Sequence, residues 1–265
     1  MIGCIIQARM GSSRLPGKVM LKLDKKNPIL YYVLKQLQSS KLLEKLVVAT
    51  TILDEDDVIE DYGKNLDVDV FRGNVNNVLD RYFNCTKKFS FSTIVRITSD
   101  NPLIDPTIVD NMIKQFTSNS YDYLTNAHVR TFPYGTEVEI FSFKALEKAW
   151  KNAKKLSERE HVTPYFYNNP DQFKIFNVEN STNISNLRWT IDRKNDLTLV
   201  KSIIYKIKKR PILMTDIIRL FSIEPKLFEI NKNQLQNKGY QKSLNEDAEY
   251  LKSKKKDGKN NEKEN

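Results

Sequence analysis

Apolar and polar positions follow two different periods in the first 120 residues. Short apolar runs of strand length stand at 2–6, 46–51, 68–71 and 93–98. Between and after them, apolar residues recur at helical spacing, which predicts helices over 28–39, from about 54, over 78–88 and over 106–116. A chain that alternates strands and helices in this way forms a parallel sheet with helices on both faces. We therefore expect an α/β fold with a doubly wound, mostly parallel sheet.

The middle of the chain has a different pattern. It predicts strands at 121–124, 137–141 and 173–178, and helices at 143–153 and about 157–168. We interpret about 121–180 as a small α+β insertion in a single domain of residues 1–238. A late strand at 187–192 and helices at 196–208 and about 214–221 are expected to follow. Residues 239–265 are rich in lysine and poor in apolar residues, so we expect a largely disordered tail.

The first strand runs directly into a polar segment that suits phosphate groups. Gly11 has no Cβ, so the backbone can approach a ligand closely, and Ser12 can donate to an oxygen. Arg9, Arg14 and Lys18 supply cations to the same short segment. The segment is not a Walker motif, because no Ser or Thr follows Lys18, and it lacks the G-x-G-x-x-G fingerprint. A solvated surface turn is the alternative for a basic loop of this kind.

Two aspartates stand where predicted strands end. Asp100 follows the run 93–98, and Asp192 closes the late strand. In doubly wound sheets, ligands bind at the carboxyl ends of strands, where a carboxylate can hold Mg²⁺. Asp100 can equally initiate the turn before Pro102, and the local sequence leaves both interpretations open. Asp105 is expected to cap helix 106–116.

Composition narrows the class of protein. The chain has 265 residues, of which 40% are hydrophobic, and no apolar run approaches a membrane span. It begins with a strand and shows no signal segment, so we expect a cytoplasmic protein without membrane insertion. Cys4 and Cys85 are expected to be reduced packing residues. The net charge of +10 would suit nucleic acid, but the lysines are diffuse or lie in the tail, so no nucleic-acid partner is expected.

The segment 8–18 reads Ala-Arg-x-Gly-Ser-x-Arg-Leu-Pro-Gly-Lys, and it resembles the amino-terminal signature of sugar cytidylyltransferases. These include the 3-deoxy-manno-octulosonate and acylneuraminate enzymes, and the nearest match is the branch named after a spore-coat polysaccharide biosynthesis protein. Further matching stretches extend the resemblance over roughly residues 2–210, namely 73–82, 96–105, 135–139 and 159–165.

The resemblance implies a Rossmann-like fold of the nucleotide-diphospho-sugar transferase type. It also implies that the protein catalyses cytidylyl transfer. CMP would pass from CTP to a sugar or sugar acid, with release of pyrophosphate, for surface polysaccharide or glycan biosynthesis. Mg²⁺ would be the cofactor, and the insertion would form a homodimer contact. Cytosine preference follows from the resemblance alone.

The resemblance also implies roles for particular residues. The catalytic groups would be Arg9, Lys18 and Asp100. The nucleotide would be bound by Ala8, Arg9, Gly11, Ser12, Arg14, Lys18 and Thr98. Asp100 and Asp192 would hold the metal, and the acceptor would contact Glu137, Glu139, Arg159 and His161. A lone histidine is more often structural or exposed than a ligand-binding residue, and this alternative applies to His161. In this chain Arg193-Lys194-Asn195 replaces the family's usual Thr-Pro-Glu after the late aspartate.

Two other functions fit some of the same features. A glycosyltransferase that uses a nucleotide-sugar donor often carries an Asp-x-Asp metal motif, and Asp67-x-Asp69 has this spacing. That pair precedes the body of its strand, so we interpret it as exposed. A non-enzymatic, basic nucleic-acid-binding protein is the second alternative. In the matching stretch 73–82, Asp80 and Arg81 are expected to pair on a helix face.

Overall fold

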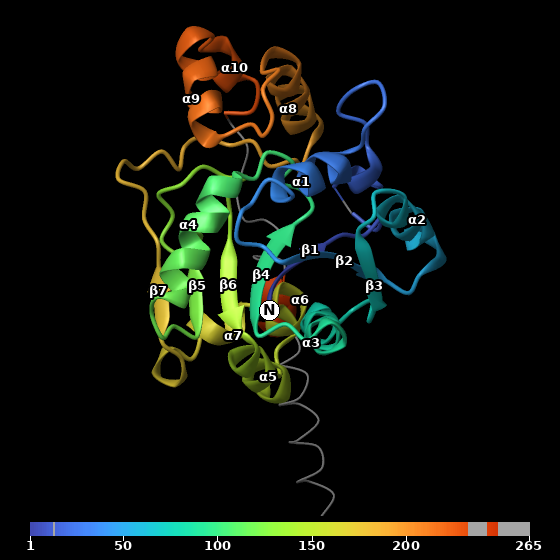
Figure 1. Cartoon of the computed structure of the whole chain (residues 1–265), viewed down its shortest axis with the longest axis vertical. Helices are drawn as coiled ribbons and strands as arrows, with labels where there is room; N and C mark the ends of the chain where they lie inside the picture. Colours follow the sequence, from blue (N-terminus) through green and yellow to red (C-terminus); the bar gives the residue numbers. More distant parts are fainter. Residues whose placement is uncertain (13, 233–242, 249–265) are drawn as a thin grey trace, which may run out of the picture.

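The sheet has seven strands in the order β3-β2-β1-β4-β6-β5-β7 (Figure 1). This is a computed structural model, and it describes residues 1–12, 14–232 and 243–248. The strands are β1 (Ile2–Gln7), β2 (Lys45–Thr51), β3 (Asp69–Gly73), β4 (Thr93–Thr98), β5 (Tyr123–Thr125), β6 (Glu139–Ser142) and β7 (Ile175–Asn177). β6 runs antiparallel to β4 and β5, and the other pairs are parallel. The expected doubly wound, mostly parallel sheet is confirmed.

Two of the helices that cover the sheet begin at a residue whose side chain caps them. Asn77 accepts from the Asp80 N–H at the start of α3. Asp105 accepts from the Thr107 N–H at the start of α4, as expected. The α-helices are α1 (Ile29–Leu37), α2 (Asp57–Asn65), α3 (Val78–Phe89), α4 (Pro106–Thr117), α5 (Phe143–Asn152), α6 (Leu156–His161), α7 (Pro164–Tyr167), α8 (Lys194–Lys206), α9 (Met214–Ile223) and α10 (Lys226–Glu229). Short 3₁₀ turns are η1 (Lys18–Met20), η2 (Asp54–Asp56) and η3 (Pro170–Gln172).

Strand side chains alternate between two hydrophobic layers. On β1, Cys4 and Ile6 pack into the layer that contains α1, α4 and α8, whereas Ile5 packs into the layer that contains α3 and α5. Cys85 belongs to the second layer, and both cysteines are buried and free. They are the packing residues that the sequence predicted. Helices on both faces bury the sheet, which explains why its parallel strands read as continuous apolar runs.

The predicted late strand at 187–192 is wrong. This segment has only an isolated bridge between Arg188 and Tyr134. The Tyr134 N–H donates to the Leu187 carbonyl (3.0 Å) and the Trp189 N–H donates to the Tyr134 carbonyl (2.8 Å). The backbone of this segment therefore forms hydrogen bonds with the loop at Tyr134. The apolar pattern of the sequence cannot distinguish a loop partner from a neighbouring strand.

Two other local expectations are also wrong. The single helix expected at about 157–168 is divided into α6 and α7, because Pro164 has no N–H with which to continue the first helix and Val162 has a φ of 71°. Asp80 and Arg81 do not pair. Asp80 accepts from the indole of Trp150, while Arg81 donates to the Asn74 carbonyl (2.7 Å).

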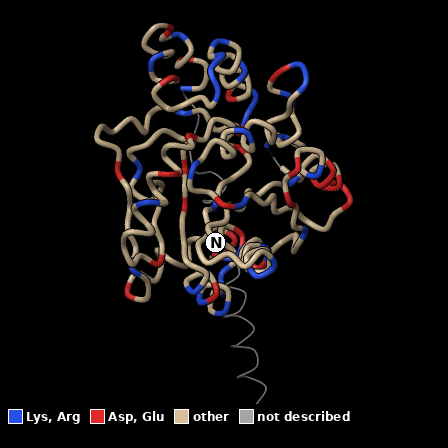
Figure 2. Tube along the Cα trace, viewed as in Figure 1, with Lys and Arg blue, Asp and Glu red and all other residues tan. Residues whose placement is uncertain are grey.

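Most of the expected tail, residues 239–265, lies outside the described residues. Residues 243–248 are described and form a helical segment against α6. Asp247 accepts from both the N–H (3.1 Å) and the hydroxyl (2.5 Å) of Ser157. None of the helices in the described ranges is long and apolar enough to cross a membrane. Positions of Lys and Arg and positions of Asp and Glu are interspersed along the described trace (Figure 2).

Gly135 lies where the loop after β5 packs closely against the segment 187–192. Its φ is 108°, and an added Cβ would lie 2.7 Å from Trp189 Cδ1 and 2.8 Å from the Thr190 nitrogen. We expect Gly135→Ala to lower the free energy of unfolding by about 2–4 kcal/mol, measured by urea denaturation, through strain and overpacking together. Val129→Ala, at a residue that is 52% exposed, should change it by less than about 0.5 kcal/mol. Equal effects of the two substitutions would contradict this contact.

Candidate active site

The order of the strands fixes where a ligand crevice opens. The chain moves from β1 outward to β2 and β3, and then returns to place β4 on the other side of β1. The strand order therefore reverses between β1 and β4, which is where ligands bind in doubly wound sheets. Gln7 pairs with Thr98 at the ends of these two strands, so the basic loop and the segment carrying Asp100 leave the sheet side by side.

The loop after β1 is curled around one peptide group. The Met10 carbonyl accepts from the N–H of Ser12 (2.7 Å) and from the N–H of Gly17 (3.0 Å). Gly17 has a φ of 63°, in the left-handed region that glycine tolerates, and η1 begins directly after it. This curl brings Arg9, Arg14 and Lys18 to the same side of the sheet edge.

A cavity of about 370 Å³ opens at this edge. It is lined by every residue that was expected to bind the nucleotide except Ala8, and by Asp100 but not Asp192 of the expected metal ligands. Its lining includes Arg9, Gly11, Ser12, Arg14, Lys18, Thr98, Asp100 and His161. Ala8 is not part of the lining, because it is 1% exposed and its N–H continues the sheet by donating to the Ala49 carbonyl (3.1 Å).

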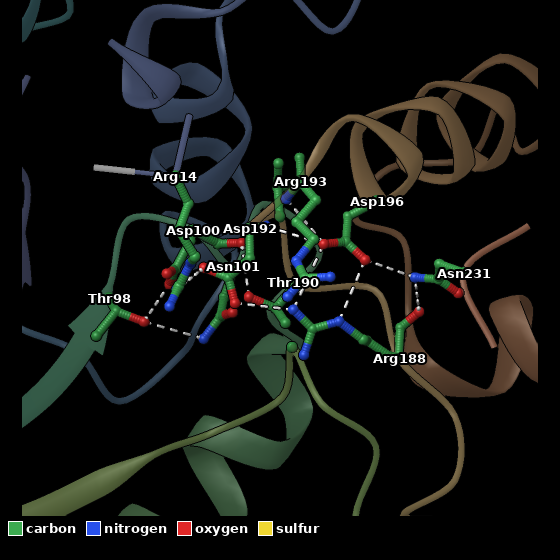
Figure 3. Close-up of polar contacts among 12 residues, drawn as sticks. Arg14, Thr98, Asp100, Asn101, Arg188, Thr190, Asp192, Arg193, Asp196 and Asn231 are labelled. Atoms are coloured by element: carbon green, nitrogen blue, oxygen red, sulfur yellow. Dashed lines mark hydrogen bonds and ion pairs between the residues drawn. The ribbon is translucent and has the colours of Figure 1, made fainter. Parts of the chain in front are cut away.

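Asp100 and Asp192 meet at a single cation. The Lys18 Nζ lies 2.8 Å from Asp100 Oδ2 and 3.1 Å from Asp192 Oδ1. The Ile191 N–H donates to the Asp100 carbonyl (2.8 Å), so a backbone hydrogen bond holds the two segments together. The carboxylates lie next to one another in Figure 3, although they are far apart in the sequence.

Each carboxylate directs only one oxygen to this point. Asp100 Oδ1 accepts from the Thr98 hydroxyl (2.5 Å), which leaves Oδ2 for the cation. Asp192 Oδ2 accepts from Arg188 (2.8 Å), which leaves Oδ1 for Lys18 and for Arg14 at 2.5 Å. The sequence reasoning missed Arg188, because a basic residue inside an apolar run carries no signal for a partner four positions later.

A buried network fixes Arg188 in turn (Figure 3). Asp196 is fully buried and accepts from Arg188 Nε (3.1 Å) and from the Asn231 amide (2.8 Å). Its other oxygen accepts from the N–H groups of Asp192 and Arg193, both at 3.0 Å. The turn before α8 is therefore closed by Asp196, whatever residues occupy 193–195. This explains how the unusual Arg-Lys-Asn stretch can support the same aspartate.

Charge pairing controls the protonation of this cluster. Burial acts to lower the pKa of Lys18, but Asp100 and Asp192 outweigh it and raise the pKa above its usual range. Burial acts to raise the pKa of Asp192, but Lys18 and Arg14 outweigh it and hold the pKa well below its usual range. Lys18 is therefore an ammonium and Asp192 a carboxylate across the physiological range.

The donor set fits a hydrated divalent ion. Two carboxylate oxygens from different segments converge on one cation, and the Lys18 ammonium supplies that cation here. Within residues 1–12, 14–232 and 243–248, no group of three or more His, Cys, Asp or Glu is placed to hold a metal. Mg²⁺ accepts such a sparse protein shell, because phosphate and water complete its octahedron.

The two predicted acceptor glutamates lie outside the lining of the cavity. Glu139 on β6 pairs with Arg96 and accepts from the hydroxyls of Tyr123 and Thr163, both at 2.6 Å. Glu137 accepts from Arg130 (2.6 Å) and from the Gly135 N–H (2.8 Å). In this structure both carboxylates are engaged in packing between segments.

Arg159 and His161 differ in position although both lie on α6. Arg159 is exposed and donates to the Ala153 carbonyl (3.1 Å), away from the cavity. His161 lines the cavity, and its Nε2 lies 2.9 Å from the hydroxyl of Ser243. Ser243 also donates to Glu160 (3.0 Å), so the segment 243–248 contributes to this wall. The sequence expectation of a disordered tail did not anticipate this contribution.

The alternative metal motif lies elsewhere. Asp67 and Asp69 are both exposed, and Asp69 is the first residue of β3. They therefore flank the amino end of a strand, whereas the cavity opens at the carboxyl ends of β1 and β4. The expectation that this pair is exposed is confirmed.

The low pKa of Asp192 predicts a pH dependence of stability. An unfolded aspartate titrates near about 3.9, so the native carboxylate contributes stability above that pH, and the contribution is lost as the pH falls towards the lower native pKa. We expect the difference in free energy of unfolding between wild type and Asp192→Asn to be constant from about pH 7 to pH 5 and to shrink below about pH 4. Asp61→Asn, at an exposed residue of α2, provides the control in urea titrations. A difference that is as large at pH 3 as at pH 7 would show that Asp192 does not depend on these cations.

Comparison with known proteins agrees with the sequence resemblance. The sequence profile of the family described as Cytidylyltransferase matches residues 3–256. The spore coat polysaccharide biosynthesis protein SpsF of Bacillus subtilis is 33% identical over 234 residues, which cover 83% of this chain and 94% of that protein. An uncharacterized protein of Methanocaldococcus jannaschii is 41% identical over 231 residues, which cover 86% and 93% of the two chains.

A solved structure extends the agreement to the fold. The structure of a cytidylyltransferase from Leptospira borgpetersenii superimposes with a TM-score of 0.83 at 38% identity, and it covers 89% of this chain and 98% of that one. The profile match spans the basic loop, Asp100 and Asp192 together. This chain belongs to the cytidylyltransferase family.

Proposed function

We propose that this cytidylyltransferase transfers CMP from CTP to a hydroxyl of a sugar or sugar acid and releases pyrophosphate. The observation that carries the proposal is that a basic loop and Asp100 line one cavity, and that Lys18 of this loop also pairs with the carboxylate of Asp192. The similarity to the Bacillus subtilis protein, which is named for spore coat polysaccharide biosynthesis, supports a role in making surface polysaccharide. The protein would then act in the cytoplasm, where CTP is available.

The reaction needs no protein nucleophile. The acceptor oxygen attacks the α-phosphorus of CTP, the bond to the bridging oxygen breaks, and pyrophosphate leaves with the electron pair. The acceptor proton passes to solvent. The protein contributes by positioning and by stabilising charge. Arg9 and Arg14 line the cavity and would bind the triphosphate, and Ser12 would donate to its oxygens. Together they would offset the charge that develops on pyrophosphate.

Enzymes of this family typically use a divalent metal ion, and we propose Mg²⁺ held by Asp100 and Asp192. Such an ion, when bound, neutralises phosphate charge and polarises the phosphoryl group. Lys18 occupies the same carboxylate oxygens in this structure. With a metal ion held by these oxygens, the Lys18 ammonium would be available for a phosphate oxygen. Lys18 would therefore have two roles, one in the ligand-free protein and one in the complex.

The wall formed by α6 and residues 243–248 would face the acceptor. Burial acts to lower the pKa of His161, and it outweighs the neighbouring Glu160 carboxylate, which acts to raise it. The lowered pKa favours a neutral imidazole near pH 7, which can exchange hydrogen bonds with a sugar hydroxyl. A role of Glu137, Glu139 or Arg159 in acceptor binding would require these residues to leave their present partners.

Incubation with each nucleoside triphosphate, Mg²⁺ and a panel of sugars and sugar acids tests the proposed reaction. We expect pyrophosphate release with CTP and one class of acceptor. Lys18→Ala should lower this rate by one to three decades, which corresponds to the ~1.5–4 kcal/mol that a lost charged contact costs at a transition state. Lys25→Ala, at an exposed lysine of the following loop, is the matched control and should retain full activity. Pyrophosphate release that is unchanged in Lys18→Ala would contradict the proposed site.

We propose that the insertion at about 121–180 forms a homodimer contact. Its outer strand β7 is at the edge of the sheet. Phe176 on this strand is 37% exposed, and its ring centroid lies 5.1 Å from that of Tyr121. An exposed edge with aromatic residues suits a two-fold interface. We expect light scattering to give about twice the 30.9 kDa chain mass at micromolar concentration, and Phe176→Glu to shift it towards the monomer. A monomer at all concentrations would contradict this proposal.

A further inference from the structure

Asp56 is a buried carboxyl group that touches neither the cavity nor any cation within ion-pair distance in the described residues. It is fully buried at the end of η2, between β2 and α2. The acidic residues beside it behave differently: Asp54 and Asp57 are exposed, and Asp57 pairs with Arg72. Acidic side chains at the start of a helix are ordinarily solvated, and they interact favourably with the helix dipole. Asp56 departs from that pattern and needs another explanation.

The contacts of Asp56 join the end of β2 to the loop after β1. Its Oδ2 accepts from the N–H (3.1 Å) and the hydroxyl (2.5 Å) of Thr51, the last residue of β2. Its Oδ1 accepts from the N–H of Met10 at 2.7 Å. Burial of a carboxyl group is costly unless its oxygens are hydrogen-bonded, and here both are.

Met10 is the residue about which the basic loop curls. While its N–H donates to Asp56, its carbonyl accepts from Ser12 and Gly17. The backbone of one residue, Met10, therefore connects the buried carboxyl group to both limbs of the loop through two successive peptide groups. Arg9 precedes Met10 directly, and Lys18 follows Gly17 directly, so the positions of both cations depend on this connection.

We propose that Asp56 is a positioning residue for the triphosphate-binding loop, acting through the backbone of Met10. The inference rests on the proposed function, because the loop's ligand is taken to be CTP. A loop that must hold several cations close together gains affinity when it is already ordered before the ligand arrives. Loss of Asp56 would leave the Met10 N–H without its partner and allow the loop to sample other conformations.

The test compares Asp56→Ala, Asp56→Asn and Asp54→Ala by calorimetric titration with CTP and Mg²⁺, at a temperature where all are folded. We expect Asp56→Ala to weaken CTP binding about tenfold or more, because loss of a buried hydrogen-bonded partner typically costs enough for a tenfold change. Asp56→Asn keeps an oxygen for the Met10 N–H and should stay within about threefold of wild type. Asp54→Ala should bind CTP as wild type does.

Amide hydrogen exchange of Met10 provides a readout that is independent of CTP. In the ligand-free wild type, this amide should exchange as slowly as amides of the central strands, and Asp56→Ala should accelerate it at least tenfold. Rapid exchange of Met10 in wild type would overturn the inference, even if Asp56→Ala fails to fold.

The binding results separate this inference from the proposed function. Wild-type CTP affinity in folded Asp56→Ala would show that Asp56 only stabilises the fold, and would overturn its positioning role. Failure of wild type and Asp54→Ala to bind CTP would overturn the proposed function, and with it the assignment of the loop to a triphosphate.

Discussion

The site depends on one electrostatic constraint, which is that two carboxylates from separate segments share a single cation. Asp100 and Asp192 approach one ammonium, that of Lys18, at 2.8 and 3.1 Å. Without a cation they would repel one another, and a triphosphate would add more negative charge. Three segments must therefore meet at the carboxyl edge of the sheet: the loop after β1, the end of β4 and the residues before α8.

The fold brings these three segments together at the carboxyl edge of the sheet. Reversal of strand order between β1 and β4 brings two of the segments together. The third is placed by backbone hydrogen bonds to Asp100 and Tyr134, and its aspartate is oriented by Arg188 and the buried Asp196. The residues that make these hydrogen bonds are buried or partly buried. The side chains of the site are therefore held rigidly although they come from loops. Rigid support of this kind is what a reaction without a protein nucleophile requires.

The sequence predicted the elements well where one period dominated, and it predicted the basic loop from its order of residues. Asp100 could be placed because it ends a clear apolar strand. The segment 187–192 was misassigned because its apolar side chains are buried in the core as a strand's would be, while its backbone bonds to the loop at Tyr134, and strand periodicity says nothing about the backbone partner. Arg188 and Asp56 were missed for a related reason. Arg188 bonds to Asp192 and Asp196, which are near in the chain but reached only through the shape of a loop. Asp56 bonds to Met10, which is far away in the chain. In both cases the partner is visible only in the tertiary structure.

The most direct test of this account is a crystal structure of the protein with CTP and Mn²⁺, in which anomalous scattering locates the metal. We expect a metal peak between Asp100 and Asp192, with the Lys18 ammonium moved from the carboxylates to a phosphate oxygen. A metal bound away from this pair, with Lys18 still bridging both carboxylates, would contradict it.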